Sequence, residues 1–206
     1  FWIGLPESEK VHIAPIRQYV PKPDDKPSEF VIALMTDPNS IQHKSFLNTG
    51  GWDFNDRKGQ AAEIGGGGGL SNARGQVAWY TELATNSGKL VSSDRLAAMS
   101  MVSTATQRDA TLLIPTRFAS GFMKSMDNRK GGYGPGTSAI IGEKAFGHVG
   151  AGGSIGFADP ECGLAFSYTM NQMGNGLLLN ERCQSLIDAA YTALGYRTNA
   201  PGAWVR

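Results

Sequence analysis

A glycine-rich stretch over residues 146–176 constrains the fold of this chain more than any other segment. Near its middle, two apolar runs flank the sequence Asp159-Pro160-Glu161-Cys162-Gly163. Proline presets the φ angle of the second turn position, and glycine adopts positive φ without steric cost. This pattern predicts an antiparallel hairpin with strands at residues 147–157 and 164–173.

The first of these strands contains five glycines, at positions 147, 150, 152, 153 and 156. Glycine inside a strand usually marks a bulge, or a place where a ligand or another backbone comes close. One ionisable side chain, His148, lies at the start of this stretch. We therefore interpret the strand as the wall of a site. The alternative is a glycine-rich hairpin with an incidental histidine.

The run Phe-Gly-His148-Val-Gly150-Ala151-Gly-Gly, followed by Gly156-Phe-Ala-Asp-Pro-Glu-x-Gly, resembles the third motif of serine β-lactamase-like hydrolases. This superfamily takes in β-lactamases, penicillin-binding proteins and related esterases, which carry Lys-Thr-Gly or His-x-Gly on a strand beside the nucleophile. The resemblance implies that His148 stands in the place of that Lys or His. It also implies that the Ala151 backbone N–H is one of two oxyanion-hole donors. The candidate catalytic residues are therefore His148, Gly150 and Ala151.

A loop at residues 125–136 precedes this motif and carries Arg129, Lys130 and Tyr133. In this position the loop either covers the site or is a plain exposed loop. Tyr133 and Gly152 are the candidate substrate-binding residues, and the implied substrate is a small ester or amide.

A second region of resemblance runs from Glu63 through five glycines at 65–69 to Arg74, and on to Leu83. In the family this block belongs to the helical subdomain. Five successive glycines cost much backbone entropy, so they form either a flexible linker or a loop that passes close to a ligand. We expect Ser71 to cap the helix that follows, and Arg74 to anchor the loop.

Capping residues and apolar spacing predict three further helices. They lie at residues 28–35 with Pro27 opening the first turn, at 92–101 with Ser92 or Ser93 as cap, and at 180–194 with Asn180 as cap and Gly195 just after the end. The last helix has an apolar stripe of Cys183, Leu186, Ile187, Ala190 and Leu194. A further strand is predicted at residues 117–123.

These elements predict an α/β fold of the α+β type, with an antiparallel sheet and a packed C-terminal helix. This is part of a β-lactamase-like fold. Residues 1–110 would form its helical, loop-rich part, and residues 111–206 the sheet and C-terminal helix of the same domain.

Composition excludes several classes of function. The 206 residues carry 19 Lys+Arg and 18 Asp+Glu, with no basic block, so nucleic-acid binding is unsupported. No apolar run approaches the length of a membrane-spanning helix. No leader peptide is evident, and the two cysteines make no disulfide framework, so a reduced, cytoplasmic setting is the default expectation. The glycine run at 131–136 lacks a P-loop lysine, and no residues cluster at metal-ligand spacing, so no cofactor is implied.

The nucleophile that this chemistry requires is missing from the sequence. No serine has lysine three residues later, and no tyrosine heads Tyr-x-Asn or Tyr-x-Ser, the two other motifs of the family. Ser71 and Ser92 have arginine at that spacing, and arginine is too strong a base to lose its proton. In the family these motifs precede the segment that residues 1–15 resemble.

The chain therefore resembles the C-terminal half of such a hydrolase. We expect it to be inactive alone, and to pair with its own N-terminal half or self-associate. The alternative is a non-catalytic binding or scaffold module on the same fold.

Overall fold

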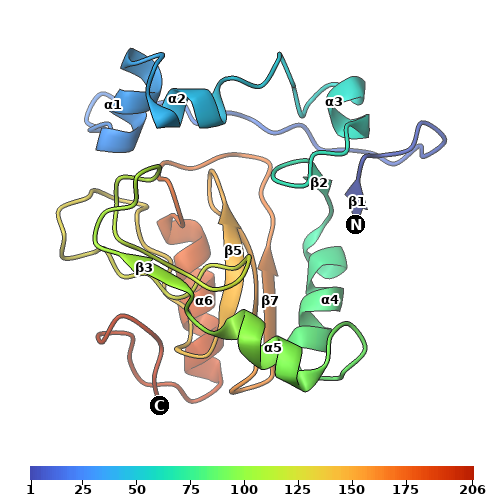
Figure 1. The fold of residues 1–206 in the computed structure, drawn as a ribbon, viewed down its shortest axis with the longest axis vertical. Helices are drawn as coiled ribbons and strands as arrows, with labels where there is room; N and C mark the ends of the chain where they lie inside the picture. The colour runs from blue at the N-terminus through green and yellow to red at the C-terminus, as the bar shows by residue number, and fades with distance from the viewer.

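A computed structural model describes all 206 residues as a mixed fold of six helices and seven strands (Figure 1). In chain order the elements are β1 (Trp2–Ile3), α1 (Glu29–Thr36), α2 (Ile41–Phe46), α3 (Arg57–Ala61), β2 (Gly69–Leu70), α4 (Ala73–Ala84), α5 (Ser93–Ser100), β3 (Thr104–Thr106), β4 (Thr116–Phe118), β5 (Phe146–Gly150), β6 (Ser154–Asp159), β7 (Leu164–Tyr168) and α6 (Glu181–Ala193). The predicted α+β class is confirmed.

The central sheet is antiparallel in the order β5-β6-β7. Its register places His148 opposite Gly156, and Ile155 opposite both Val149 and Tyr168. A second hairpin, β3-β4, joins the β5 side through Met123, which bridges to Phe118 and to Gly147. The sheet therefore continues past β5 at the Gly147 level.

The predicted strand at 147–157 is wrong, because this stretch forms two strands instead of one. β5 and β6 pair with each other and are joined by a tight turn at Gly150–Gly153. Gly152 and Gly153 have φ angles of +87° and +108°, which extended strands of L-residues do not adopt. The glycines therefore mark a reversal of the chain.

The predicted turn at 159–163 is confirmed as the β6–β7 connection, with Gly163 at a φ of +69°. Two predicted strands are shorter than expected. The segment 117–123 divides into β4 and the single bridging residue Met123, because the chain reverses in between, where the Ala119 N–H donates to the Phe122 carbonyl. β7 ends at Tyr168.

The predicted capping residues are largely confirmed. Ser92 and Asn180 cap α5 and α6 as predicted, and Gly195 follows α6 with a φ of +82°. The start of α1 was predicted one turn position too early, because Ser28 is its N-cap and Pro27 lies before the helix. The prediction for α4 was one residue off, because the side chain that accepts from the Gly75 N–H belongs to Asn72. Asparagine is at least as good a cap as serine.

Helix α6 packs on one face of the sheet. Cys183, Ile187 and Tyr191 are fully buried in one cluster with Ile155 and Phe157. The predicted stripe was partly wrong, because Leu186 and Leu194 are 47% and 44% exposed. The buried positions recur every four residues, so Tyr191 completes the stripe.

Helix α4 covers the opposite face, so the sheet lies between α6 and α4 (Figure 1). Tyr80 and Leu83 of α4 form a second cluster with Phe146 and Ala158 of the sheet. Tyr80 packs directly on Gly156, where an added Cβ atom would lie 2.4 Å from its ring. Burial raises the pKa of Tyr80 to about 12.

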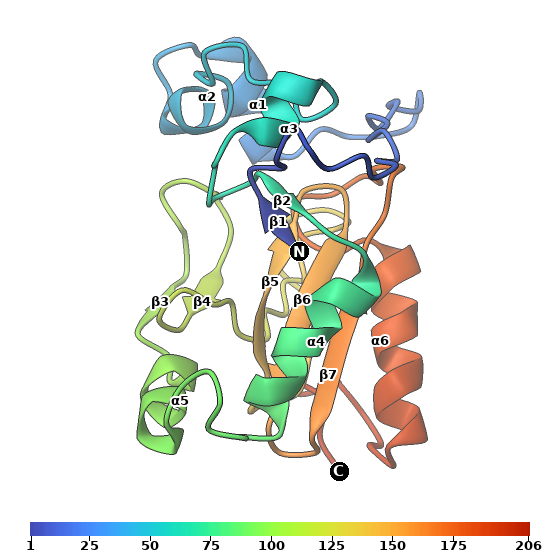
Figure 2. The same cartoon turned by 90° about the vertical axis from the view of Figure 1, so that its right-hand side faces the viewer.

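The segment with α1, α2 and α3 lies across the top of the molecule in both views (Figures 1 and 2). It is fastened at several points. β1 pairs with β2, and Arg17 forms a parallel bridge with Gln172 beyond β7. None of the six helices combines the length and the apolar character needed to cross a membrane.

Candidate functional site

Strand β5 presents His148 on the face of the sheet that α4 partly covers. Side chains alternate between the two faces, and Phe146 packs in the cluster with Tyr80 and Leu83, so His148 and Gly150 face the same side. His148 is exposed, and its nearest aromatic neighbour is Phe118, with 6.5 Å between the ring centroids. Its side chain is therefore open to a molecule approaching this face.

The imidazole of His148 is oriented by its own strand. Its Nδ1 atom lies 2.8 Å from the Val149 carbonyl oxygen. A hydrogen bond at this position requires a proton on Nδ1, which leaves Nε2 of the neutral ring as a free acceptor. The outward nitrogen can therefore accept a proton from a group placed beside β5.

On the edge of β5 that faces away from β6, the backbone is hydrogen-bonded only at Gly147. The Gly147 N–H and C=O both bond to Met123, at 3.0 and 2.6 Å. Because bonded positions alternate along an antiparallel strand, Val149 also turns its N–H and C=O away from β6. Ala151, which follows in the turn, is exposed, and its N–H has no hydrogen-bond partner within the chain. An unpaired N–H beside an exposed histidine can stabilise a developing negative charge on oxygen.

The turn that carries Ala151 is tightly specified. The Gly153 N–H donates to the Gly150 carbonyl at 3.0 Å, and the positive φ of Gly152 is typical of the third position of a type II turn. Gly152 is buried, and a Cβ atom there would lie 2.8 Å from Met170 and Met173 atoms. Both the conformation and the packing therefore require glycine.

Two donors hold the Gly152 carbonyl from outside the turn. The Asn180 Nδ2 donates to it at 2.8 Å, and the Gly174 N–H at 3.0 Å. Asn180 also caps α6, since its Oδ1 accepts from the Cys183 N–H. The turn is thus connected to the first residues of α6.

Tyr133 lies in the loop ahead of the site, where its half-buried ring packs against the main core cluster and over Gly131. Its role as a substrate contact stays a prediction. The loop is held by Arg129, which bonds to Asp127 at 2.7 Å and to Asn199 at 2.9 Å. The hydrogen bond from Arg129 lowers the pKa of the Asp127 carboxyl below its usual range.

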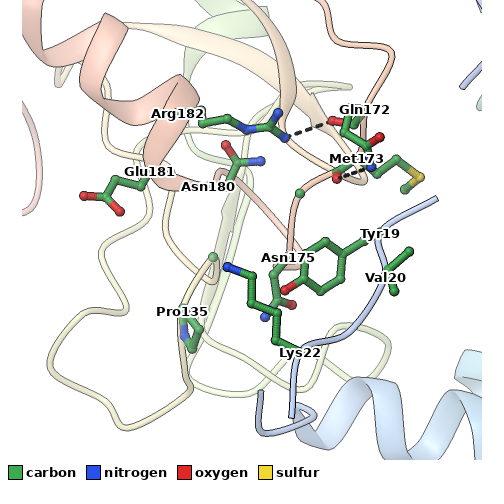
Figure 3. A pocket seen from close by; sticks show the side chains of 12 residues that line it. Tyr19, Val20, Lys22, Pro135, Gln172, Met173, Asn175, Asn180, Glu181 and Arg182 are labelled. Atoms are coloured by element: carbon green, nitrogen blue, oxygen red, sulfur yellow. Dashed lines mark hydrogen bonds between the residues drawn. The ribbon is translucent and has the colours of Figure 1, made fainter. Parts of the chain in front are cut away.

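A hollow of about 480 Å³ lies between the Tyr19–Lys22 segment, the Gln172–Asn175 segment and the start of α6 (Figure 3). Its lining includes Met173, Gly174 and Asn180, which also contact Gly152. Lys22 and Arg182 contribute positive charge, and Arg182 Nη2 donates to the Gln172 carbonyl at 2.9 Å. His148 does not line this hollow, which adjoins the glycine turn through Met173, Gly174 and Asn180.

A second hollow of about 680 Å³ shares Pro135, Gly136, Asn180 and Glu181 with the first. It extends along α6 past Gln184 to Asp188, which accepts hydrogen bonds from Gln184, Asn199 and Trp204. No group of three or more His, Cys, Asp or Glu side chains is arranged to hold a metal ion.

The structure brings four of the predicted site residues together, namely His148, Gly150, Ala151 and Gly152, because they are consecutive or nearly so. The sequence did not predict the hydrogen bond from Asn180 to the glycine turn, or the packing of Tyr80 against Gly156. Asn180 was recognised as a cap, but its contact with Gly152 spans 28 residues and leaves no local signal.

Comparison with known proteins decides the family. A family model described as "Beta-lactamase" matches residues 3–186. The chain belongs to the β-lactamase family. Esterase/beta-lactamase LipL of Mycobacterium tuberculosis (strain ATCC 25618 / H37Rv) is 32% identical to it over 126 residues, covering 58% of this chain and 26% of LipL.

Solved members and homologues of the family share the fold. A family VIII carboxylesterase superposes with a TM-score of 0.65 at 32% identity, covering 92% of this chain and 46% of its own. EstA from Arthrobacter nitroguajacolicus Rue61a superposes with a TM-score of 0.72 at 25% identity, covering 94% of this chain and 49% of EstA. A penicillin-binding protein homologue from Caulobacter crescentus superposes with a TM-score of 0.64 at 28% identity, covering 93% of this chain and 48% of the homologue. The chain therefore spans about half the length of these structures, and the predicted resemblance to the superfamily is confirmed.

Proposed function

We propose that this chain supplies one wall of the active site of a serine hydrolase that cleaves a small ester or amide through an acyl-enzyme. The observation that carries the proposal is the unpaired Ala151 N–H at the open end of β5, beside exposed His148. The relatives described as an esterase and a carboxylesterase support ester chemistry.

The two groups have different roles in this reaction. When a serine oxygen attacks the substrate carbonyl carbon, the carbonyl oxygen becomes negatively charged, and the Ala151 N–H donates a hydrogen bond to it. His148 supports that charge, or the proton transfer to the departing alcohol or amine, through its outward Nε2 atom. Hydrolysis of the acyl-enzyme by water then restores the serine.

The nucleophile comes from a segment outside these 206 residues. No Ser-x-x-Lys occurs in the chain, and a free serine without a positioned base is a poor nucleophile. We propose that this segment docks against the open edge of β5, and that the chain alone does not turn over substrate.

The test uses the chain alone and the chain assembled with a half that carries Ser-x-x-Lys, with p-nitrophenyl butyrate as substrate. We expect the assembly to hydrolyse the ester and to react with a fluorophosphonate at one serine of the added half. His148→Ala should lower kcat on the order of 10²-fold. His12→Ala is the matched control, since His12 is another exposed histidine outside the site.

Stoichiometric fluorophosphonate labelling of a single serine in the chain alone would contradict the proposal that the nucleophile lies elsewhere. Unchanged turnover in a folded His148→Ala assembly would remove His148 from the reaction. An assembly that folds without any hydrolysis would favour the non-catalytic module.

A further inference from the structure

Asn180 uses both ends of its side-chain amide at once. The Oδ1 atom accepts from the Cys183 N–H at 3.4 Å and so caps α6, while the Nδ2 atom donates to the Gly152 carbonyl at 2.8 Å. We propose that Asn180 is a positioning residue that fixes the Gly150–Gly153 turn, and with it the direction of the Ala151 N–H, by fastening the turn to α6.

The packing around Asn180 is as specific as its hydrogen bonds. A Cβ atom on Gly153 would lie 2.2 Å from Asn180 Nδ2, and one on Gly174 would lie 2.4 Å from the same atom. Glycine therefore occupies both backbone positions that lie against the Asn180 amide. A residue that only capped a helix would not require glycine at either position.

The Gly152 carbonyl is the point at which the three segments meet. It accepts from Asn180 Nδ2 and from the Gly174 N–H, so its direction is fixed from two sides. Gly152 and Ala151 are neighbours in a four-residue turn. The Gly152 carbonyl shares a peptide unit with the Gly153 N–H, which donates to the Gly150 carbonyl, and that carbonyl shares a peptide unit with the Ala151 N–H. Fixing the Gly152 carbonyl therefore also fixes, through the hydrogen bond that closes the turn, the peptide that carries the Ala151 N–H.

Helix α6 is a rigid support for this arrangement. Three of its side chains, Cys183, Ile187 and Tyr191, are fully buried, and Cys183 is also the residue whose N–H Asn180 caps. A donor held within a few tenths of an ångström of its working position is more effective than one on a free loop. The part of the inference that concerns catalysis rests on the proposed function, whereas the fastening of the turn does not.

Asn180→Asp separates the two roles of the side chain. Aspartate has the same shape and remains a good cap, favoured by the positive end of the helix dipole. It has no donor for the Gly152 carbonyl, and it places a negatively charged oxygen against that carbonyl. Asn72→Asp is the matched control, because Asn72 caps α4 through the Gly75 N–H and its side chain makes no other hydrogen bond.

The first measurement is amide hydrogen exchange of the 206-residue chain by NMR. We expect the Gly153 and Gly174 amides, which bond to the Gly150 and Gly152 carbonyls, to exchange about 10-fold faster in Asn180→Asp, while amides within α6 keep their protection. Asn72→Asp should leave both glycine amides unchanged. Unchanged exchange at Gly153 and Gly174, or an equal loss of protection along all of α6, would overturn the proposal.

Asn180→Ser provides a second variant if the aspartate prevents folding, because serine also caps the helix but is too short to reach Gly152. In the assembled hydrolase, either variant should lower kcat about 10-fold with little change in KM, since the turn no longer holds the N–H in place. Faster exchange without any ester hydrolysis by the wild-type assembly would refute the proposed function and leave the fastening role intact. An active assembly whose kcat is unaffected by either variant would overturn the positioning role.

Discussion

Gly156 is the residue that allows α4 to approach the sheet beside His148. It lies opposite His148 in the β5–β6 register, and the Tyr80 ring occupies the space where a side chain would be. Tyr80 is only 8% exposed, so its ring has little freedom to move aside. This close approach explains a glycine that the sequence alone marks only as a bulge or a ligand contact.

Gly156→Ala should therefore destabilise the fold. The new methyl group would lie 2.4 Å from Tyr80 Cε2, and overpacking of this kind costs about 1–3 kcal/mol. The free energy of unfolding in urea measures the effect. Gly66→Ala is the control, because a Cβ atom added at Gly66 would meet no atom within 4 Å, and it should change stability by less than about 0.5 kcal/mol. Equal stabilities of the two variants would show that Tyr80 moves freely.

Lys124 is the one lysine that is buried, at 5% exposure, and none of the ion pairs of the molecule includes it. Burial is the main cause that lowers the pKa of its amine. The unfolded chain then binds the proton more tightly than the folded chain does. The contribution of Lys124 to the free energy of unfolding therefore rises as the pH increases from its lowered pKa to the ordinary lysine range.

Lys124→Met should raise the free energy of unfolding at pH 7 by about 1 kcal/mol, because it removes the cost of burying the charge. It should also flatten the rise in stability between pH 7 and pH 10, as measured by thermal unfolding across that range. Lys144→Met, at an exposed neighbour outside any ion pair, should do neither. A loss of stability in Lys124→Met at pH 7 would mean that the amine has favourable contacts that outweigh its burial.

At the scale of elements, the sequence predicted those features that depend on local chemistry. Ser92 and Asn180 act within one helical turn, and Pro160 with Gly163 specifies one reversal, so each was found. The overall class and family followed from motifs of the same short range.

The errors came from competition between segments that are distant in sequence. The strand at 147–157 was predicted whole because it forms one of the two apolar runs that flank the turn at 159–163. Whether Gly150–Gly153 bulges or turns depends on Met170, Met173 and Asn180, which pack against the glycines from outside. In α6, Leu186 is apolar but faces away from the sheet, whereas Tyr191 is fully buried against it. Which of the two faces of α6 is buried depends on where the sheet lies, and the helix sequence does not show this.

At the scale of the molecule, ten of the exposed large apolar side chains fall into two groups. Phe1, Trp2, Ile3 and Trp79 form one group near the start of α4, where the rings of Phe1 and Trp79 are 5.9 Å apart. The other group lies on α1 and α2 and around their ends: Val31, Ile32, Met35, Ile41, Phe46 and Leu47. Exposed apolar surface on this scale is typical of a protein that contacts another chain.

We expect the isolated chain to elute from size exclusion with a light-scattering mass above its 22.0 kDa. Trp79→Ser with Phe1→Ser should shift the population toward the monomer, because the pair removes two of the three aromatic rings of the first exposed group. Leu186→Ser is the control, since Leu186 is similarly exposed but belongs to neither group. A well-folded monomer across micromolar concentrations, with cooperative unfolding, would show that the chain closes its core without a partner.

The bridge between Arg17 and Gln172 has a consequence for the order of folding. The Gln172 side chain also bonds to the Gln18 carbonyl, a contact between residues 154 apart in sequence. Closing so long a loop costs conformational entropy, and only a few exposed hydrogen bonds offset that cost. We therefore expect this bridge to form after the sheet and α6 have assembled. Tyr19 and Lys22 follow directly from it and complete the wall of the first hollow. We therefore expect that hollow to close late in folding and to open early in unfolding.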